Sequence, residues 1–221
     1  MLKSIGQLLL VVWASSLAAQ DTLHLQTTAI QPDFLAKDSS GHYYLSTQSG
    51  TILRYDSDTR ESIYGTVPAL QYQIDGIDTR FTFKTFVYSL ELQQIVLYSR
   101  WLSNPVTYNL QDFNILARAV SWSSTNELWV LDQLSGLLLK IDLVRRERVL
   151  EVRSDVWVGL AEIKTFWEWN NTLYISDEKA TYQVSQQGFV QQVPYLPKNQ
   201  LGESLPYNYV QKSGYSLLIT P

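Results

Sequence analysis

The sequence predicts an all-β fold built from a repeated unit of three to four antiparallel strands. The clearest copy of the unit is 126–142, in which an apolar strand, 128–131, and a return strand, 137–141, flank a turn that ends at Gly136. Hairpins of the same design recur along the chain. No stretch after the first residues keeps the 3.6-residue spacing of apolar side chains that an amphipathic helix needs, so few helices are expected. Aromatic residues make up 13% of the chain, a high share that suits pleated, half-buried surfaces.

Four further hairpins align with 126–142. Three of them have an apolar strand, a polar or Gly-containing turn and a second strand, and the last contributes its first strand alone. Lys140-Ile141-Asp142 mirrors Arg54-Tyr55-Asp56. The four hairpins are 41–56, 94–110, 171–184 and 213–220. A short strand precedes each of the five hairpins, at 33–36, 84–88, 116–120, 164–167 and 207–210. A more charged strand follows two of them, at 61–64 and 148–152.

The spacing of the hairpins is that of propeller blades. Their first strands end at Thr47, Ser99, Asp132, Asp177 and Thr220, in steps of roughly 33 to 52 residues that average about 43, against about 40 to 50 residues in typical blades. A single unit cannot cover both faces of its own sheet, whereas radially stacked units cover one another. We therefore predict one β-propeller domain of about five blades over 20–221.

The last predicted blade is incomplete. Its hairpin, 213–220, lacks outer strands, and the strand-like segment 21–26 would close the ring by pairing with it. Without that pairing the propeller is open or irregular. A β-sandwich is the alternative architecture.

The repeat pattern, Leu-Tyr/Trp-x-x-Asp/Thr, then a turn, then Ile-Leu-Lys/Arg-x-Asp, resembles the blades of NHL, PQQ-like and gluconolactonase-like propellers. The segment 94–142 also resembles short secreted propeller proteins of Bacteroidetes-type envelopes. Both resemblances imply the propeller fold, and neither identifies a functional residue. The chain is unlike WD-repeat propellers, because Gly41-His42 occurs once and no Trp-Asp dipeptide completes that pattern.

The N-terminus has the layout of a secretory signal peptide. Lys3 precedes the apolar run 8–14 and the small-residue segment 15–19. We predict a signal peptide over 1–19, cleaved after Ala19, and no transmembrane segment in the mature chain; an uncleaved N-terminal anchor is the alternative. The chain has no cysteine, which in an exported protein favours a bacterial envelope. The expected location is the periplasm, the outer membrane surface or the cell exterior.

Charge and motifs exclude several classes of function. The net charge of −4 gives the chain no overall positive footprint for nucleic acid. The basic cluster 145–148 is interpreted as the solvated end of an outer strand. His24 and His42 show no metal-ligand spacing, and no G-x-S-x-G elbow or phosphate-binding glycine loop is present. No catalytic residue, cofactor or metal ligand is assigned.

The gluconolactonase-like resemblance implies a calcium ion held by oxygen ligands at the central channel. The candidates by position are Asp75, Asp78, Asp132 and Asp177. Asp132 and Asp177 end the same strand in two repeats, so hydrogen bonds to their own turns explain them as well. Asn170 begins a possible glycosylation sequon with Thr172, but it lies at an expected hairpin turn, and the turn is the preferred interpretation.

The tryptophans offer the best candidate for a contact surface. Trp129 lies among apolar neighbours and is predicted to pack between blades. Trp101 lies in the longest hairpin turn, 100–105, where core packing explains a Trp least. An exposed Trp beside Arg and Leu is typical of an interface anchor, so Arg100, Trp101 and Leu102 are predicted to bind a partner.

The leading hypothesis is an exported, non-enzymatic propeller that binds another envelope protein as a scaffold or accessory subunit. One alternative is a calcium-dependent lactonase or hydrolase of the gluconolactonase type. The other is a glycan-binding module that uses exposed aromatic rings.

Overall fold

The computed structural model describes residues 32–194, except 39, 48–49, 57–58, 60–61, 67–73, 82, 154, 159 and 161, together with 209–210. The chain divides into Met1–Ile30 and Gln31–Pro221, and the second unit holds every element described below. The predicted signal peptide, 1–19, the segment 21–26 and the hairpin 213–220 lie outside the described residues.

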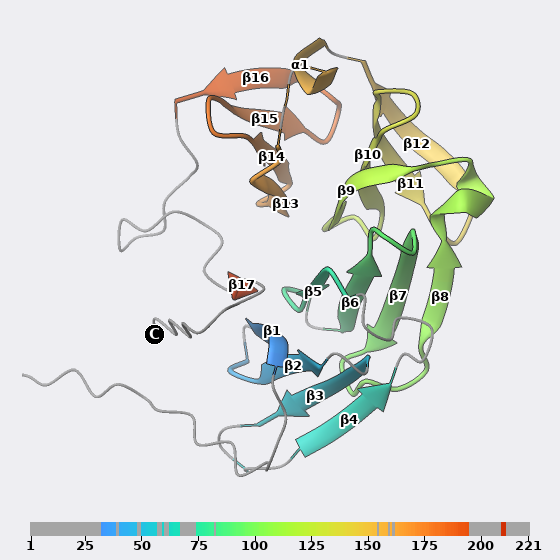
Figure 1. Cartoon of the computed structure of the whole chain (residues 1–221), viewed down its shortest axis with the longest axis vertical. Coiled ribbons are helices and arrows are strands. Elements are labelled where there is room, and N and C mark those ends of the chain that lie inside the picture. The colour runs from blue at the N-terminus through green and yellow to red at the C-terminus, as the bar shows by residue number, and fades with distance from the viewer. Residues whose placement is uncertain are drawn as a thin grey trace, which may run out of the picture. The chain divides into compact units, whose positions relative to one another are not determined.

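Four antiparallel sheets make up the described fold (Figure 1). Blade 1 contains β1 (Pro32–Lys37), β2 (Tyr43–Thr47), β3 (Thr51–Tyr55) and β4 (Ser62–Thr66). Blade 2 contains β5 (Gly76–Asp78), β6 (Lys84–Ser89), β7 (Gln94–Ser99) and β8 (Val106–Asn109). Blade 3 contains β9 (Ala117–Trp122), β10 (Leu128–Asp132), β11 (Leu138–Asp142) and β12 (Glu147–Val152), and blade 4 contains β13 (Thr165–Trp169), β14 (Thr172–Ser176), β15 (Thr181–Ser185) and β16 (Val190–Val193). Within the described ranges, helical structure is confined to η2 (Leu110–Phe113) and α1 (Asp155–Val158).

The sheets confirm the predicted all-β fold and the propeller class, and the described residues form four blades where about five are predicted for the chain. The strands of each blade follow one another across its sheet in chain order. The first strands of neighbouring blades meet, β1 with β5 and β9 with β13, and these four are called the inner strands below. Asn170 and Asn171 form the predicted turn between β13 and β14, with φ angles of 47° and 59° that suit a type I′ hairpin.

Blade 2 corrects the predicted alignment of the repeats. The hairpin 94–110 was aligned with the second and third strands of the other blades, but β7 and β8 are the third and fourth strands of blade 2. The sequence pattern missed β5, because a strand of three residues shows no alternation. With β5 in place, the second strands end at Thr47, Ser89, Asp132 and Ser176, and the uneven steps become an even spacing of about 42 to 44 residues.

The C-terminal strand β17 (Tyr209–Val210) joins blade 1 at the free edge of β1. Leu35 pairs with Val210, and Ala36 pairs with Tyr209. The segment 207–210 was predicted to be the inner strand of a fifth blade, and its described part is instead a fifth strand of the first sheet. The reason is general: an unpaired edge exposes N–H and C=O groups that a second extended segment can satisfy.

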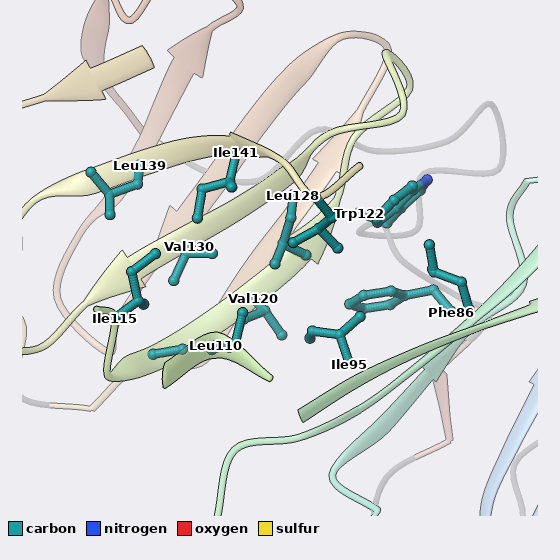
Figure 2. Packing of buried hydrophobic residues seen from close by; sticks show 13 residues of the cluster. Phe86, Ile95, Leu110, Ile115, Val120, Trp122, Leu128, Val130, Leu139 and Ile141 are labelled. Carbon is teal, nitrogen blue, oxygen red and sulfur yellow. The ribbon is translucent and has the colours of Figure 1, made fainter. Parts of the chain in front are cut away.

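Apolar clusters hold the blades together. Successive side chains along one strand belong in turn to the cluster on one face of the sheet and to the cluster on the other. In β10, Leu128 and Val130 pack toward blade 2, whereas Trp129 and Leu131 pack toward blade 4. Figure 2 shows the cluster between blades 2 and 3, where Phe86 and Ile95 meet Val120 and the other labelled side chains. The full set of fully or nearly buried residues in that cluster is Phe86, Ile95, Leu97, Leu110, Ile115, Ala117, Val120, Trp122, Leu128, Val130, Leu139, Ile141 and Leu143. Trp129 is completely buried, which confirms its predicted place between blades.

Two buried polar side chains also join the blades. The Gln93 amide of blade 2 donates from Nε2 to the Ala117 carbonyl at 2.9 Å and accepts at Oε1 from the Ala117 N–H at 2.6 Å, as a neighbouring strand would. Glu168 of blade 4 accepts hydrogen bonds from the Ser123 hydroxyl at 2.6 Å, the Ser124 N–H at 2.7 Å and the Trp129 indole N–H at 2.6 Å. These bonds satisfy polar groups that would be costly to bury unpaired.

The pKa of Glu168 is lowered by its hydrogen bonds. Burial alone raises the pKa of the carboxyl group, but hydrogen bonds from Ser123, Ser124 and Gln186 outweigh burial and leave the pKa lowered. The carboxylate is therefore the stable form in the fold.

Acid should weaken the junction between blades 3 and 4 through Glu168. The pKa of Glu168 in the folded state lies below the unfolded value of 4.5. The stabilisation that the Glu168 carboxylate contributes is therefore fully present above pH 4.5 and is lost as the pH falls through the folded pKa. Glu168→Gln should lower the free energy of unfolding at neutral pH by about 1–3 kcal/mol. In this variant the free energy of unfolding should also decrease less steeply as the pH falls. Urea denaturation across a pH series measures both effects. Glu151→Gln, at an exposed carboxylate that pairs with Arg148, is the control, and an unchanged pH slope in Glu168→Gln would contradict the prediction.

Candidate functional site

A pocket of about 380 Å³ lies among the inner strands of blades 2, 3 and 4 and β6, and is called the inner pocket. Its volume falls in the range of small-molecule sites. Aromatic and polar side chains line it together: Asp78, Arg80, Phe86, Tyr88, Val120, Ser121, Lys164, Thr165, Phe166 and Trp167. Three different blades contribute, so only the assembled propeller forms this site.

Arg80 is the best-positioned cation of the inner pocket. Its Nε donates to both carboxylate oxygens of Asp78, at 2.8 and 3.0 Å, and its Nη2 also donates to Asp78. The guanidinium group lies 4.7 Å from the ring centroid of Trp167 and 5.4 Å from that of Phe81. An ion pair and aromatic contacts therefore fix one charged plane against the pocket wall.

Trp167 carries an unused hydrogen-bond donor. The side chain is only 7% exposed, and its Nε1 has no hydrogen-bond partner among the described residues. A buried indole N–H normally finds an acceptor, and leaving one unpaired costs about 1–3 kcal/mol. The Nε1 atom is itself buried, so Trp167 lines the pocket with other atoms of its ring.

The predicted calcium ligands do not form a common site. Asp132 accepts from the Leu116 N–H at 3.0 Å and from Ser135, and Asp177 accepts from the Lys179 and Ala180 N–H groups at 2.8 Å. Each of these two aspartates therefore stabilises the turn in which it lies. For Asp132, burial raises the pKa, and hydrogen bonds from Ser135, Leu116 and Leu134 outweigh it, so the net pKa is lowered.

The other two aspartates and the described histidine also have local partners. Asp75 accepts from the Leu90 N–H at 2.7 Å, and Asp78 pairs with Arg80. His42 contacts Asp38 at 2.8 Å in blade 1. No group of three or more His, Asp or Glu side chains arranged for a metal occurs in the part of the chain that the structure describes.

Trp101 is exposed, as the sequence predicts for a contact residue. Its side chain is 53% exposed in the loop between β7 and β8. Two guanidinium groups flank the ring, that of Arg54 at 4.7 Å and that of Arg100 at 5.0 Å from the centroid. Ser99 organises the loop through its hydroxyl, which accepts from the N–H groups of Trp101 and Ser103. Trp101 and Arg100 are called the Trp101 surface below.

Leu102 is not part of that surface. Only 5% of it is exposed, and it packs in the cluster between blades 1 and 2 against Gly65. A Cβ on Gly65 would lie 2.9 Å from the Leu102 Cβ, so the absence of a side chain at 65 makes room for Leu102. Leu102 was predicted to bind a partner together with Arg100 and Trp101, and the chain instead turns it inward, where it anchors the loop.

Sequence reasoning missed Arg54, Arg80 and the donor of Trp167. Arg54 stands where Lys140 stands in the repeat, and Lys140 also lies over a tryptophan, Trp129, at 5.1 Å. That shared position was a usable signal. Arg80 had no such signal, since its partner Trp167 lies in another blade.

In the described portion of the chain, no helix combines the length and the apolar character that crossing a membrane requires.

Comparison with known proteins yields structural likeness alone. No family model matches the chain, and no curated protein matches it. A catalytically inactive virginiamycin B lyase from Staphylococcus aureus, solved with quinupristin, aligns with a TM-score of 0.57 at 13% identity over 80% of this chain and 60% of that one. The extracellular domain of the putative one component system BT4673 from B. thetaiotaomicron aligns with a TM-score of 0.52 at 14% identity over 76% of this chain and 25% of that one.

The chain thus spans about 60% of the lyase it resembles. At 13 and 14% identity these similarities show the β-propeller fold and assign no activity to this chain.

Proposed function

We propose that this protein is an exported, non-enzymatic β-propeller that binds another protein of the cell envelope through the Trp101 surface. The observation that carries the proposal is an exposed tryptophan held between two guanidinium groups. Trp and Arg are the residues most enriched among those that dominate binding energy at interfaces.

The Trp101 surface is organised before any partner arrives. Ser99 and Ser103 hydroxyls lie 2.7 Å apart across the loop, and Leu102 is anchored in the core below. A side chain that is already ordered loses less conformational entropy on binding. The loop therefore has the rigidity expected of an interface anchor.

Export is supported by the signal-peptide layout of 1–19 and is consistent with a structural neighbour that is an extracellular domain. The lactonase alternative is not proposed, because Asp75, Asp78, Asp132 and Asp177 are each engaged by local partners.

Trp101→Ala should reduce recovery of the partner at least about tenfold in co-purification from native envelope extract, scored by quantitative mass spectrometry. Its own stability should change by less than about 1 kcal/mol, because the side chain is half exposed. Phe189→Ala is the control, since Phe189 is 76% exposed on blade 4. Equal recovery with wild type and Trp101→Ala would overturn the assignment of this surface.

A second candidate function is binding of a carbohydrate in the inner pocket. Flat aromatic rings stack on the apolar faces of sugars, and polar groups fix the hydroxyls. The pocket offers both kinds of group, Phe166 and Trp167 among the rings and Asp78, Arg80 and Ser121 among the polar groups. The concave setting of Trp167, with polar side chains around it, favours this pocket over the exposed Trp101 as the place for a glycan.

Trp167→Phe should weaken carbohydrate binding while the fold persists. The substitution replaces the indole by a smaller ring, which reduces the surface on which a sugar can stack. It keeps an aromatic wall, so the variant should lose less than about 2 kcal/mol of stability. A glycan array followed by calorimetric titration of any hit measures the effect, with Trp101→Ala as the matched tryptophan control. No bound glycan, or equal affinity in Trp167→Phe and wild type, would remove this candidate.

A further inference from the structure

A second recess, of about 490 Å³, runs between blades 2 and 3 and is called the blade groove. It is lined by Phe83, Lys84, Leu97, Tyr98, Ser99, Asn104, Val106 and Tyr108 of blade 2, and by Trp122, Thr125, Asn126, Asp142, Val144 and Arg145 of blade 3. We propose that the blade groove binds an extended peptide segment of the partner that carries a bulky apolar side chain next to acidic ones. This inference rests on the proposed function and names the chemistry of the partner.

The rim of the groove is unusually apolar for a free surface. Phe83 is 76% exposed, Val144 is 78% exposed and Val106 is 49% exposed, and all three line the same recess. Single exposed apolar residues are ordinary, but several around one concave site mark a binding surface. The groove therefore suits a bulky apolar side chain.

The charges at the groove favour acidic partners. Lys84 and Arg145 both line it, whereas the whole chain carries a net charge of −4. Asp142 is the one carboxylate among the lining residues, and its Oδ1 accepts from the Val144 and Arg145 N–H groups at 2.9 Å. Its Oδ2 also lies 3.7 Å from the Arg145 Nε, so Asp142 partly neutralises Arg145. Two cations and one carboxylate leave the described lining with a net charge of about +1, carried mainly by Lys84.

The groove also contains an unused donor. Trp122 is 2% exposed, and its Nε1 has no hydrogen-bond partner among the described residues. Figure 2 shows the indole nitrogen turned away from the apolar cluster that packs the rest of the ring. The Lys84 ammonium group lies 5.5 Å from the ring centroid, so a cation and a neutral N–H donor are close together. The Nε1 atom is itself buried, so the contact offered to a bound carboxylate is the Lys84 cation beside the ring.

The shape of blade 2 favours an extended segment. β8 is the last strand of its sheet, so one edge of its backbone has no neighbouring strand in the described sheet. Val106 and Tyr108 of β8 line the groove. Extended peptides bind such edges by adding a strand, and side-chain pockets beside the edge select the sequence.

The groove is continuous with the Trp101 surface. The Arg100 N–H donates to the Phe83 carbonyl at 3.2 Å, and Ser99 and Asn104, which flank Trp101 in the same loop, line the groove. One partner could therefore contact both.

The test uses the full mature protein and synthetic peptide pools, read by fluorescence polarisation. The pools share a fixed Phe or Leu and differ in the flanking positions, which are Asp/Glu, Asn/Gln or Lys/Arg. The acidic pool should bind at least about tenfold more tightly than the neutral pool, and its advantage should shrink as salt rises from about 0.05 to 0.3 M. Phe83→Ser should weaken binding of the acidic pool about tenfold. Phe189→Ser, at a Phe that is equally 76% exposed, should leave binding unchanged.

A double variant, Lys84→Met with Arg145→Gln, separates charge from apolar contact. It should bind acidic and neutral pools alike, because it retains Phe83 and loses both cations. Equal binding of all pools by wild type, or binding that Phe83→Ser leaves intact, would overturn the inference. Binding of anionic vesicles in place of every peptide pool would also overturn it. The proposed function is tested separately, by the recovery of the partner with Trp101→Ala in the co-purification. A failure of the proposed function can therefore be told from a failure of this inference.

Discussion

The fold depends on one constraint: a blade with a neighbour on each side, as blades 2 and 3 have, must bury both faces of its sheet against two different blades. A strand in this position cannot show the alternation of apolar and polar residues that a half-exposed sheet shows. β10 meets the constraint with five buried residues in succession, of which Leu128 and Val130 face one blade and Trp129 faces the other. The same arrangement explains why blades that are neighbours in the sequence are also neighbours in the fold, since each cluster joins two consecutive sheets.

Polar side chains fix how the blades meet, and the candidate sites follow from that. Gln93 completes the backbone pairing of Ala117 between blades 2 and 3, and Glu168 gathers donors between blades 3 and 4. Apolar packing alone is tolerant of small shifts, whereas these hydrogen bonds require fixed positions. The inner pocket draws residues from three blades, so its geometry depends on these junctions.

The binding surfaces lie where the repeat is least regular. Blade 2 begins with a strand of three residues and has, between β7 and β8, the long loop that exposes Trp101. Its neighbour contributes Val144 and Arg145 from the loop after β11. Loops tolerate such changes because the clusters between blades already supply the stability. The regular positions serve packing, and the irregular ones present aromatic and cationic groups outward.

The sequence by itself determined the all-β class, the repeat and the exposed position of Trp101, because hairpin patterns and turn residues are local properties. It also predicted that Asp132 holds a turn and that Trp129 packs between blades. The tertiary structure alone decided that Leu102 turns inward beside Gly65, that Gly76–Asp78 forms an inner strand, and that Arg80 meets Trp167. The first and the last of these outcomes join residues 37 and 87 positions apart, and the second rests on a strand too short to show alternation, so no local pattern could reveal them.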